Sequence, residues 1–425
     1  MNICYVIEYF YPFNIGGAEI SAFEHAKELV KVGNKVIIIT PNYGTKNYEI
    51  IDGVEIYRFK FKKLKFGKEI NSLYFINPIY YLYLAFWVYR IVKKNNCDIV
   101  HAQNAYSIIG SFVASKLLGK KFFVTLRDCS NICCLGAFCL LEKKFPPSKC
   151  GLFKNLVCLP KYQKLYSLNI GYFKKLKLVL RLFVQFIDLI LRKKIIKMST
   201  KIITVSDAIG EIYQRIGFPK NKMVTVYNLP PKIEKVDGQE IKNIKNKLGL
   251  NNKKVVLYVG KMSYGKGTDV LIKAIPEVVK SVPDVCFVFV GRTNPLIRIP
   301  QEIKDYVKVL GHISNKEVQT LYELCDLVVI PSVWPEPYPR VALEAIAHNK
   351  KIVATNAGGI SEIISKYKGG FFVERKNENV LAEKISFVLN LTKEAPNNQY
   401  ETDFLTEMRK NVIERLIKVY SIDKN

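Results

Sequence analysis

The sequence is short of acidic residues. It holds 37 Asp and Glu against 65 Lys and Arg in 425 residues, so its formal net charge is +28. The deficit is uneven, because residues 151–200 contain 11 basic residues and one acid, Asp188. Such a basic surface attracts phosphate-bearing partners: nucleic acid, an anionic membrane or phosphorylated small molecules. A composition rich in Lys, Ile and Asn would produce the same excess without any function.

The sequence also lacks a long apolar run. Its longest uncharged stretch, residues 70–89, contains two asparagines, a serine, a proline and five tyrosines. A membrane-spanning helix needs about 20 mostly apolar residues, so we expect no span here. Residues 1–7 have the pattern of a strand and no basic start precedes an apolar segment, so we expect no secretory signal peptide. The ten cysteines are then expected to be reduced thiols in a cytoplasmic protein.

What is present is an alternation of strands and helices in a chain long enough for two or three domains. Continuous Val/Ile strands separated by helices indicate parallel sheets covered on both faces. We therefore expect an α/β protein with two Rossmann-like domains that face each other across a cleft. The predicted strands are 2–7, 35–40, 54–61 (an edge strand), 98–102, 121–126, 201–205, 223–227, 254–260, 285–291, 307–310, 327–330, 351–355 and 370–373.

The expected domains follow from a polar, Pro- and Gly-containing stretch near the middle of the chain. Residues 1–230 form the first domain, 231–253 a linker with a short helix, and 254–400 the second domain, while a final helix at 402–420 packs back across the first. The predicted helices are 18–32, 78–94, 105–118, a long basic helical region 160–198, 207–216, 268–281, 315–324, 339–348, 360–365 and 377–391, with a Cys-rich loop at 129–158.

Glycine-containing loops follow the first strand of each half. Gly16 and Gly17 open a helix, where backbone without a Cβ and free N–H groups could hold a phosphate or a sugar hydroxyl. A tight strand-to-helix turn would use the same residues. In the second half, Lys261 and Lys266 flank a Gly-containing loop, which suits a diphosphate whose charge must be neutralised as a bond to it breaks. The alternative is that both are solvated lysines.

The most specific string is PSVWPEPYPRVALEAIA, residues 331–347. It places Glu336 on a loop and Glu344 inside the following helix, about 8–12 Å apart at about 1.5 Å per residue. That distance is too long for two carboxyls that share a proton, but the two could hold different parts of one extended ligand. A third loop at the same edge of the sheet carries Gly358, Gly359 and Glu362.

These strings resemble glycosyltransferase family 4, the group 1 type with the two-domain GT-B fold. GGAE at 16–19, VHAQN at 100–104, VSDAIGEI at 205–212 and VYNLPP at 226–231 are similar to its first domain. VGKMSYGKG at 259–267, EPYPRVALEA at 336–345 and NAGGISEII at 356–364 are similar to its second. The resemblance covers nearly the whole chain.

The resemblance implies a retaining enzyme that takes a sugar from a nucleotide-sugar donor, without a metal or another cofactor. The second domain would hold most of the donor, with Lys261 and Lys266 at the diphosphate, Glu336 at the transferred sugar and Glu344 at the ribose. The acceptor would be a glycan or a lipid-linked molecule, in cell-surface polysaccharide or glycolipid synthesis. The implied donor-binding residues are Gly16, Gly17, Lys261, Lys266, Glu336, Pro337, Tyr338, Arg340 and Glu344, and the catalytic candidates are Glu336, Lys266, Lys261, His101 and Arg127.

The sequence departs from the family pattern at three positions. Lys261 stands where Arg is usual and loses bidentate geometry. Tyr338-Pro339 replaces Phe-Gly, so one backbone N–H is absent. Arg127 occupies the place of a His, and it could supply charge there. His101, at the end of a predicted strand, is either a second candidate or a structural residue.

Two further features leave alternatives open. Cysteines 129, 133, 134, 139, 150 and 158 crowd one loop, where they form either packed thiols or a structural zinc site. Residues 172–197 form a basic amphipathic helix, which could lie on the inner face of an anionic membrane or pack against the first domain. No zinc finger, helix-turn-helix or ribonucleoprotein sequence occurs, so we expect no nucleic-acid partner.

Two alternatives to a glycosyltransferase remain at this point. One is another GT-B enzyme, such as a nucleotide-sugar epimerase, which the Arg replacing His at 127 favours. The other is a degraded membrane-surface binding module, which the intact pair Glu336 and Glu344 disfavours.

Overall fold

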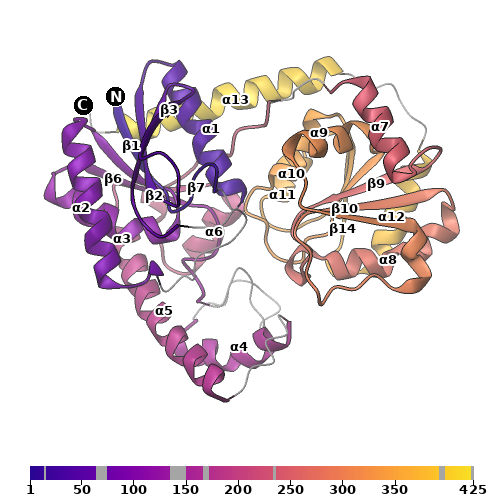
Figure 1. The fold of residues 1–425 in the computed structure, drawn as a ribbon, viewed down its shortest axis with the longest axis horizontal. Coiled ribbons are helices and arrows are strands. Elements are labelled where there is room, and N and C mark those ends of the chain that lie inside the picture. Colours follow the sequence, from indigo (N-terminus) through magenta and orange to yellow (C-terminus); the bar gives the residue numbers. More distant parts are fainter. Residues whose placement is uncertain are drawn as a thin grey trace. The chain divides into compact units, whose positions relative to one another are not determined.

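The chain divides into two compact units. In the computed structural model, unit 1 comprises Met1–Lys164, Leu168–Leu229 and Lys410–Asn425, and unit 2 comprises Leu165–Ser167 and Pro230–Arg409 (Figure 1). The structure describes residues 1–13, 16–63, 74–134, 150–165, 172–232, 236–391 and 398–422.

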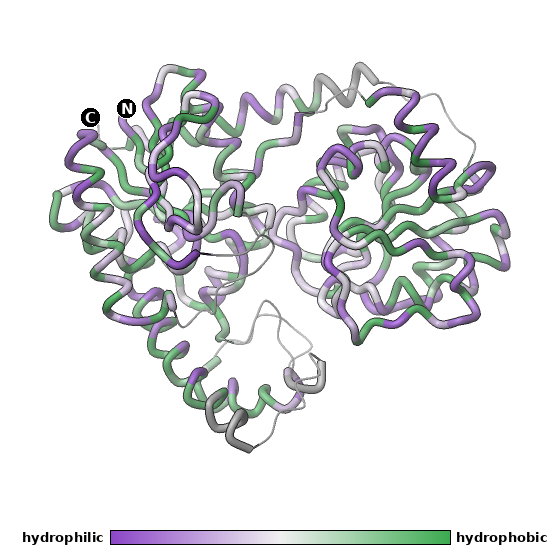
Figure 2. The backbone as a smooth tube through the Cα atoms, in the orientation of Figure 1, coloured by the Kyte–Doolittle hydropathy of each residue, from purple (hydrophilic) through white to green (hydrophobic). Residues whose placement is uncertain are grey.

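Unit 1 is built on an eight-stranded sheet in the order β3-β4-β2-β1-β5-β6-β7-β8. Every neighbouring pair is parallel except β3 and β4. The central strands are continuous runs of buried Val, Ile and Phe, as helices on both faces of a parallel sheet require (Figure 2). The strands are β1 (Asn2–Val6), β2 (Lys35–Asn42), β3 (Tyr48–Ile51), β4 (Val54–Lys60), β5 (Ile99–Ala102), β6 (Lys121–Leu126), β7 (Lys201–Thr204) and β8 (Met223–Thr225).

The prediction that the strand at 54–61 lies at the sheet edge was wrong. β3 pairs antiparallel with β4 and takes the outermost position. The two strands are joined by Asp52 and Gly53, both with positive φ (50° and 78°), as a tight two-residue hairpin turn requires. An Asp-Gly pair between apolar runs is a recognised hairpin signal, so the sequence did contain the information.

The predicted helical region at 160–198 is two helices in the described residues. α4 (Leu152–Leu165) begins inside the expected Cys-rich loop, and α5 (Tyr172–Met198) follows it. α5 is held to the unit by Asp188, the one acid in this basic stretch. The Asp188 carboxylate accepts hydrogen bonds from Arg192 Nε at 2.8 Å and from the Tyr81 hydroxyl at 2.6 Å.

The other helices of unit 1 cover both faces of its sheet. The described ones are α1 (Gly17–Lys31), α2 (Pro78–Lys94), η2 (Ala105–Ser107), α3 (Ile108–Leu117), α6 (Asp207–Arg215) and η3 (Lys220–Lys222). Among the helices that the structure describes, none has the length and apolar character needed to cross a bilayer.

The C-terminal helix belongs to both units. α13 (Asn398–Tyr420) starts in unit 2, and its last turns are part of unit 1. There Leu416 and Tyr420 are buried, and the Tyr420 hydroxyl lies 3.0 Å from that of Tyr5 on β1. The final helix therefore completes the core of unit 1.

Unit 2 contains a six-stranded parallel sheet in the order β11-β10-β9-β12-β13-β14. Its strands are β9 (Lys254–Val259), β10 (Val285–Val290), β11 (Val307–Gly311), β12 (Leu327–Ile330), β13 (Lys351–Thr355) and β14 (Gly370–Val373). Its helices are α7 (Gly238–Leu248), η4 (Tyr264–Lys266), α8 (Thr268–Ser281), η5 (Gln301–Tyr306), α9 (Asn315–Leu324), α10 (Arg340–Ala347), α11 (Ile360–Ile364) and α12 (Glu378–Asn390). α7 lies in the stretch expected as a linker and packs against α9.

Each sheet has one point where the strand order reverses. In unit 1 the chain runs from β1 to β2 on one side, and β5 lies on the other side of β1. In unit 2 the same reversal separates β9 from β12. Loops leaving two such strands diverge, and ligands of open parallel sheets bind in the crevice between them. The β1–β5 and β9–β12 switch points are therefore the places to look for function.

Candidate functional site

The loop after β9 is held close to the loop after β12. Gly267 caps α8 in the left-handed conformation, with φ +68°, and a Cβ placed on it would lie 1.8 Å from the Pro331 carbonyl oxygen. No side chain fits that gap, so this position requires glycine. The Gly265 carbonyl accepts hydrogen bonds from the backbone N–H groups of Val333 at 2.9 Å and Trp334 at 3.1 Å. Direct backbone hydrogen bonds therefore hold the loop after β9 and the loop after β12 together.

A second close approach fixes Glu336 from the other side. Its backbone pairs with the loop after β13, since Glu336 N–H donates to the Ala357 carbonyl and its own carbonyl accepts from Gly359 N–H at 2.7 Å. Gly358 has φ +68°, and a Cβ there would lie 2.4 Å from the Glu336 carbonyl oxygen. Gly358 and Gly359 therefore serve to let this loop approach Glu336.

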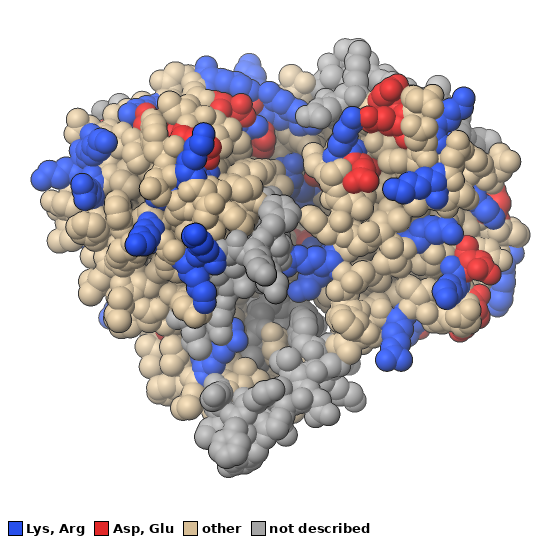
Figure 3. Space-filling model, viewed as in Figure 1, with Lys and Arg blue, Asp and Glu red and all other residues tan. Residues whose placement is uncertain are grey.

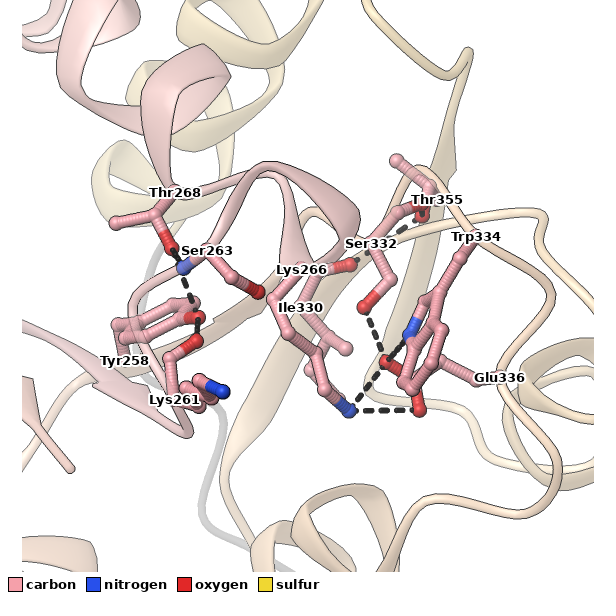
Figure 4. Close-up of polar contacts among 10 residues, drawn as sticks. All are labelled: Tyr258, Lys261, Ser263, Lys266, Thr268, Ile330, Ser332, Trp334, Glu336 and Thr355. Atoms are coloured by element: carbon pink, nitrogen blue, oxygen red, sulfur yellow. Dashed lines mark hydrogen bonds and ion pairs between the residues drawn. The ribbon is translucent and has the colours of Figure 1, made fainter. Parts of the chain in front are cut away.

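The Glu336 carboxylate is the centre of a compact polar cluster (Figure 4). Lys266 Nζ lies 2.6 Å from its Oε1 and 2.9 Å from its Oε2. Two further donors reach Oε1: the Ser332 hydroxyl at 2.5 Å and the Trp334 indole N–H at 2.6 Å. A carboxylate that is almost fully buried needs such partners, because an unpaired buried charge is strongly destabilising.

The cluster is open on its lysine side. The Lys266 side chain is 30% exposed, whereas that of Glu336 is 3% exposed. The Lys266 ammonium also lies 4.9 Å from the centre of the Trp334 ring, in a cation–π contact. The site thus offers an incoming ligand a cation for an anionic group and a carboxylate that can accept from hydroxyls.

Lys261 lies apart from this cluster, on the Tyr258 side of the loop (Figure 4). Its side chain is exposed, and its backbone carbonyl accepts from the Tyr258 hydroxyl at 2.9 Å. The same hydroxyl lies 3.0 Å from Thr268 Oγ1, and burial raises the pKa of Tyr258. Tyr258 therefore positions the loop, and the Lys261 ammonium stays in solvent.

Glu344 and Arg340 lie on α10, which begins at Arg340 after Pro339. The Glu344 carboxylate accepts from the Tyr322 hydroxyl at 3.0 Å and lies 3.5 Å from Arg340 Nε. Arg340 Nη1 is buried with no hydrogen-bond partner among the described residues. Pro337 and Tyr338 come before Pro339 in the chain. Pro337 is half-buried and Tyr338 is buried, with its hydroxyl 3.9 Å from Met408 Sδ.

At the β1–β5 switch point of unit 1, Gly16 and Gly17 are exposed at the start of α1. The Gly16 N–H donates to the Glu19 carboxylate at 2.9 Å, so the N-terminus of the helix already has an internal anion. Glu19 is buried and also accepts from Asn104 Nδ2 at 3.4 Å. Burial raises the pKa of Glu19 above its ordinary value.

His101 is buried below this edge, with both ring nitrogens occupied. Nδ1 lies 2.6 Å from the Tyr420 hydroxyl and Nε2 lies 2.7 Å from Thr125 Oγ1. Burial, with the nearby Arg127 and His25, lowers its pKa, so the ring is neutral. In the described residues, His101 therefore contacts protein groups on both sides.

Arg127 is the charged residue nearest to that network. Its Nη2 donates to Gln103 Oε1 at 2.6 Å and its Nη1 to Asn228 Oδ1 at 3.3 Å. Burial lowers its pKa to about 10, and the guanidinium remains charged at neutral pH. Gln103 in turn lies 3.1 Å from His101 Nδ1, so Arg127 and His101 belong to one hydrogen-bonded chain.

The cysteine cluster is only partly within the described residues, because Cys139 lies outside them. Cys129 and Cys158 are buried, and Asn155 lies between Cys133 and Cys150, at 3.4 and 3.6 Å from their sulfurs. Burial raises the pKa of Cys129, and raises that of Cys134 to about 12. In the part of the chain that the structure describes, no three His, Cys, Asp or Glu residues group as metal ligands would.

The sequence analysis missed two groups of residues. Ser332 and Trp334 were in the quoted string but had no role, because nothing in a sequence shows which residues bind the Glu336 carboxylate. Glu8, which follows β1, was not a candidate, because a single acid after a strand has no motif. Glu19 stood in the quoted GGAE string but had no role of its own. Their position at a switch point becomes visible only when the strand order is known.

Many proteins of known sequence are similar to this chain, and three of them illustrate the range. An uncharacterized glycosyltransferase from Methanocaldococcus jannaschii is 24% identical, with 99% of this chain and 98% of the relative covered. Spore coat protein SA from Bacillus subtilis is 32% identical, covering 45% of this chain and 55% of that protein. A third relative, from Campylobacter jejuni, is N,N'-diacetylbacillosaminyl-diphospho-undecaprenol alpha-1,3-N-acetylgalactosaminyltransferase. It is 27% identical, covering 55% of this chain and 65% of that protein. The match thus spans about half the length of spore coat protein SA.

Solved structures share the fold over the whole chain. A glycosyltransferase from Rickettsia africae superposes with a TM-score of 0.64 at 19% identity, covering 100% of this chain and 99% of that one. Anabaena Alr3699/HepE, solved in complex with UDP and glucose, gives 0.61 at 18% identity, covering 99% and 97%. The expected GT-B arrangement of two parallel-sheet domains is confirmed.

Family models match both halves of the chain. Residues 240–403 match the model described as glycosyl transferases group 1. Residues 15–229, half of the chain, match the model of glycosyltransferase family 4. The protein belongs to glycosyltransferase family 4 and is a group 1 glycosyltransferase.

Proposed function

We propose that the protein is a retaining glycosyltransferase that transfers a hexose from a nucleotide-sugar donor to a glycan or lipid-linked acceptor, in the synthesis of a cell-surface polysaccharide or glycolipid. The observation that carries this proposal is the Lys266–Glu336 pair at the β9–β12 switch point. It brings a half-exposed cation and a buried carboxylate within 2.6 Å of each other, where a ligand of an open parallel sheet binds.

Each charged group has a role in that reaction. The Lys266 and Lys261 ammonium groups would neutralise the diphosphate, whose negative charge grows as its bond to the sugar breaks. Glu336 would accept hydrogen bonds from hydroxyls of the transferred sugar, and Glu344 from hydroxyls of the ribose. The acceptor oxygen bonds to the anomeric carbon on the face that the diphosphate leaves, and its proton passes to the departing diphosphate oxygen. The protein then acts by positioning and by stabilising charge.

Two comparisons support the classes of donor and acceptor. Anabaena HepE was solved with UDP and glucose, and the Campylobacter jejuni relative is named for an acceptor carried on diphospho-undecaprenol. Both comparisons agree with a nucleotide-sugar donor and a lipid-linked acceptor for this chain.

The donor proposal is tested by calorimetry of the full chain with a panel of nucleoside diphosphates. We expect one of them to bind, and the affinity to fall at least tenfold in Lys266→Ala and in Glu344→Ala. Lys280→Ala is the matched control, because Lys280 on α8 is 71% exposed and pairs only with Glu277 in the described residues. If no nucleotide binds the wild type, the proposal fails.

We further propose that unit 1 lies on an anionic membrane surface through α5. Four apolar side chains follow one face of this helix and are 43–60% exposed: Leu180, Phe183, Ile187 and Leu191. The exposed Lys194 and Lys197 lie near the end of the same helix, and Figure 3 shows Lys and Arg spread over the drawn face of unit 1. An apolar stripe beside lysines is the pattern of a helix in the plane of a membrane interface.

Sedimentation with phosphatidylglycerol vesicles tests this surface. We expect Phe183→Glu with Ile187→Glu, and separately Lys194→Glu with Lys197→Glu, to release the protein. Lys193 is unsuitable for this test, because it donates to the Ile132 carbonyl at 3.2 Å and burial lowers its pKa. Lys242→Glu with Lys247→Glu on α7 is the charge-matched control. Unchanged sedimentation of both α5 variants would exclude this helix as the anchor.

A further inference from the structure

The β1–β5 switch point holds a carboxyl group whose role the donor site does not explain. Glu8 follows β1 and is 6% exposed. Backbone groups of Tyr106, in η2, and of Glu8 itself act on this carboxyl and partly offset the rise in its pKa. Its Oε2 is buried with no hydrogen-bond partner among the described residues. A buried polar atom without a partner costs free energy, so such an atom at a switch point suggests that a ligand completes it.

Glu8 belongs to a cluster with a second incomplete group. The Glu8 and Glu19 carboxyls interact, and Glu19 interacts with the Arg127 guanidinium. Arg127 Nη1 and Nη2 have partners, but its Nε is also buried without one in the described part of the chain. The cluster therefore leaves one carboxyl oxygen and one N–H unsatisfied, at the ends of β1 and β6.

The groups around Glu8 disfavour a negative charge on its carboxyl. The groups that act on it are Glu19 of α1, Asp128 after β6, Tyr43 after β2 and Tyr80 of α2. Burial, followed by the Glu19 carboxyl, raises the pKa of Glu8 to about 8. At pH 7 the group is therefore mostly the neutral acid, which can donate a hydrogen bond as well as accept one.

This chemistry disfavours a phosphate as the ligand, although Arg127 belongs to the same cluster. A phosphate would meet three acidic side chains, and the Gly16 N–H at the start of α1 is already paired with Glu19. A sugar hydroxyl fits better, because it can accept from the Glu8 acid and donate to it, and it requires no neutralising charge.

We propose that Glu8 is a binding residue that holds a hydroxyl group of a neutral carbohydrate acceptor at the β1–β5 switch point of unit 1. The inference rests on the proposed function, because it assigns the acceptor to unit 1. It also defines the chemical class: the sugar that receives the transferred residue is uncharged where it meets Glu8.

Glycoside binding to the full chain tests the assignment. The probes are the methyl glycosides of glucose, galactose and N-acetylglucosamine, titrated by saturation-transfer NMR at pH 7 and pH 9. With a midpoint near 8, the acid form falls from about nine-tenths to about one-tenth, so wild-type affinity should fall about tenfold. Glu8→Gln keeps a neutral donor and cannot ionise, so we expect its affinity at both pH values to stay within about threefold of the wild-type affinity at pH 7. Glu8→Ala should bind, at both pH values, at least tenfold more weakly than wild type at pH 7.

Controls separate this site from the donor site and from misfolding. Glu24→Gln, on α1 and paired with Lys27, should behave as wild type. Nucleoside diphosphate binding should be unchanged in all Glu8 variants, which also reports that unit 2 is folded. In protein labelled with ¹³C at the glutamate carboxyls, a resonance titrating near pH 8 should vanish in Glu8→Gln.

Four results would overturn the proposal while leaving the donor site intact. They are a wild type that binds none of the glycosides, affinity that does not change between pH 7 and pH 9, Glu8→Gln as weak as Glu8→Ala, and competition of the glycoside by inorganic phosphate. Loss of nucleotide binding in the wild type would instead contradict the proposed function.

Discussion

The loops at the two switch points have opposite chemistry. In unit 2, the Lys266 ammonium meets a buried carboxylate, and Ser332 and Trp334 also donate to Glu336. In unit 1, the Glu8 and Glu19 carboxyls interact with each other, and burial raises the pKa of each. The same sheet topology therefore presents an ion pair in one unit and a mostly neutral acid in the other. The +28 charge of the chain does not determine the polarity of either site.

The two units also differ in how well their glycine-containing loops tolerate an added side chain. We expect Gly267→Ala to destabilise unit 2 by more than about 4 kcal/mol, because the new Cβ meets backbone at 1.8 Å and the position has φ +68°. Gly16→Ala should cost less than about 1 kcal/mol, since its φ is −156° and its nearest neighbour would be 3.9 Å away. Thermal unfolding of both variants measures the difference. Equal losses would contradict the view that only the unit 2 loops are locked by glycine.

A smaller expected effect is the pH dependence that the Glu8 carboxyl gives to the free energy of unfolding. The folded-state pKa of Glu8 is about 8 and its unfolded value is about 4.3, so the folded state binds more protons between these limits. The stability that Glu8 contributes is complete below pH 4 and is lost as pH rises through 8. Glu8→Gln cannot ionise and should gain roughly 2–4 kcal/mol over wild type between pH 5 and pH 9.

Urea unfolding at both pH values measures this gain. Glu24→Gln provides the baseline, because that carboxyl is paired at the surface. A Glu8→Gln variant that keeps a constant offset from wild type at pH 5 and pH 9 would show that Glu8 is ionised in the folded protein.

The smallest expected effect concerns the network below the unit 1 site. Tyr420→Phe removes a hydroxyl that lies 2.6 Å from His101 Nδ1 and 3.0 Å from the Tyr5 hydroxyl, and we expect a loss of about 1–2 kcal/mol. Nucleotide binding in unit 2 should not change. A change in nucleotide affinity without a change in melting temperature would show that the network acts on the other unit.

Much of the fold could be predicted from the sequence, because long parallel strands are continuous apolar runs. Thr268–Ser281, Asn315–Leu324 and Leu327–Ile330 have the predicted bounds. The failures have local causes. The Asp52-Gly53 turn was not interpreted as a hairpin, and the crowded cysteines led to a predicted loop over 129–158, which concealed the start of α4 at Leu152.

Only the site residues that stand in recognisable motifs could be predicted from the sequence. Lys266 and Glu336 were both candidates, but they are 70 residues apart, and no spacing rule pairs them. Glu8 could not be found, since its unpaired oxygen and its neighbours depend on the order of β1, β5 and β6 in the sheet. His101 had two interpretations, and only its contacts with Thr125 and Tyr420 show that both nitrogens are occupied.

The division of α13 between the units has a consequence for synthesis of the chain. Unit 2 ends at Arg409, whereas the core of unit 1 needs Tyr420, five residues from the last. As the chain leaves the ribosome from its N-terminus, unit 1 begins first and is completed only after unit 2 has emerged. A fragment ending at Leu229 therefore lacks part of its own core. Expression of unit 1 alone requires residues 410–425 to be joined to it by a designed linker.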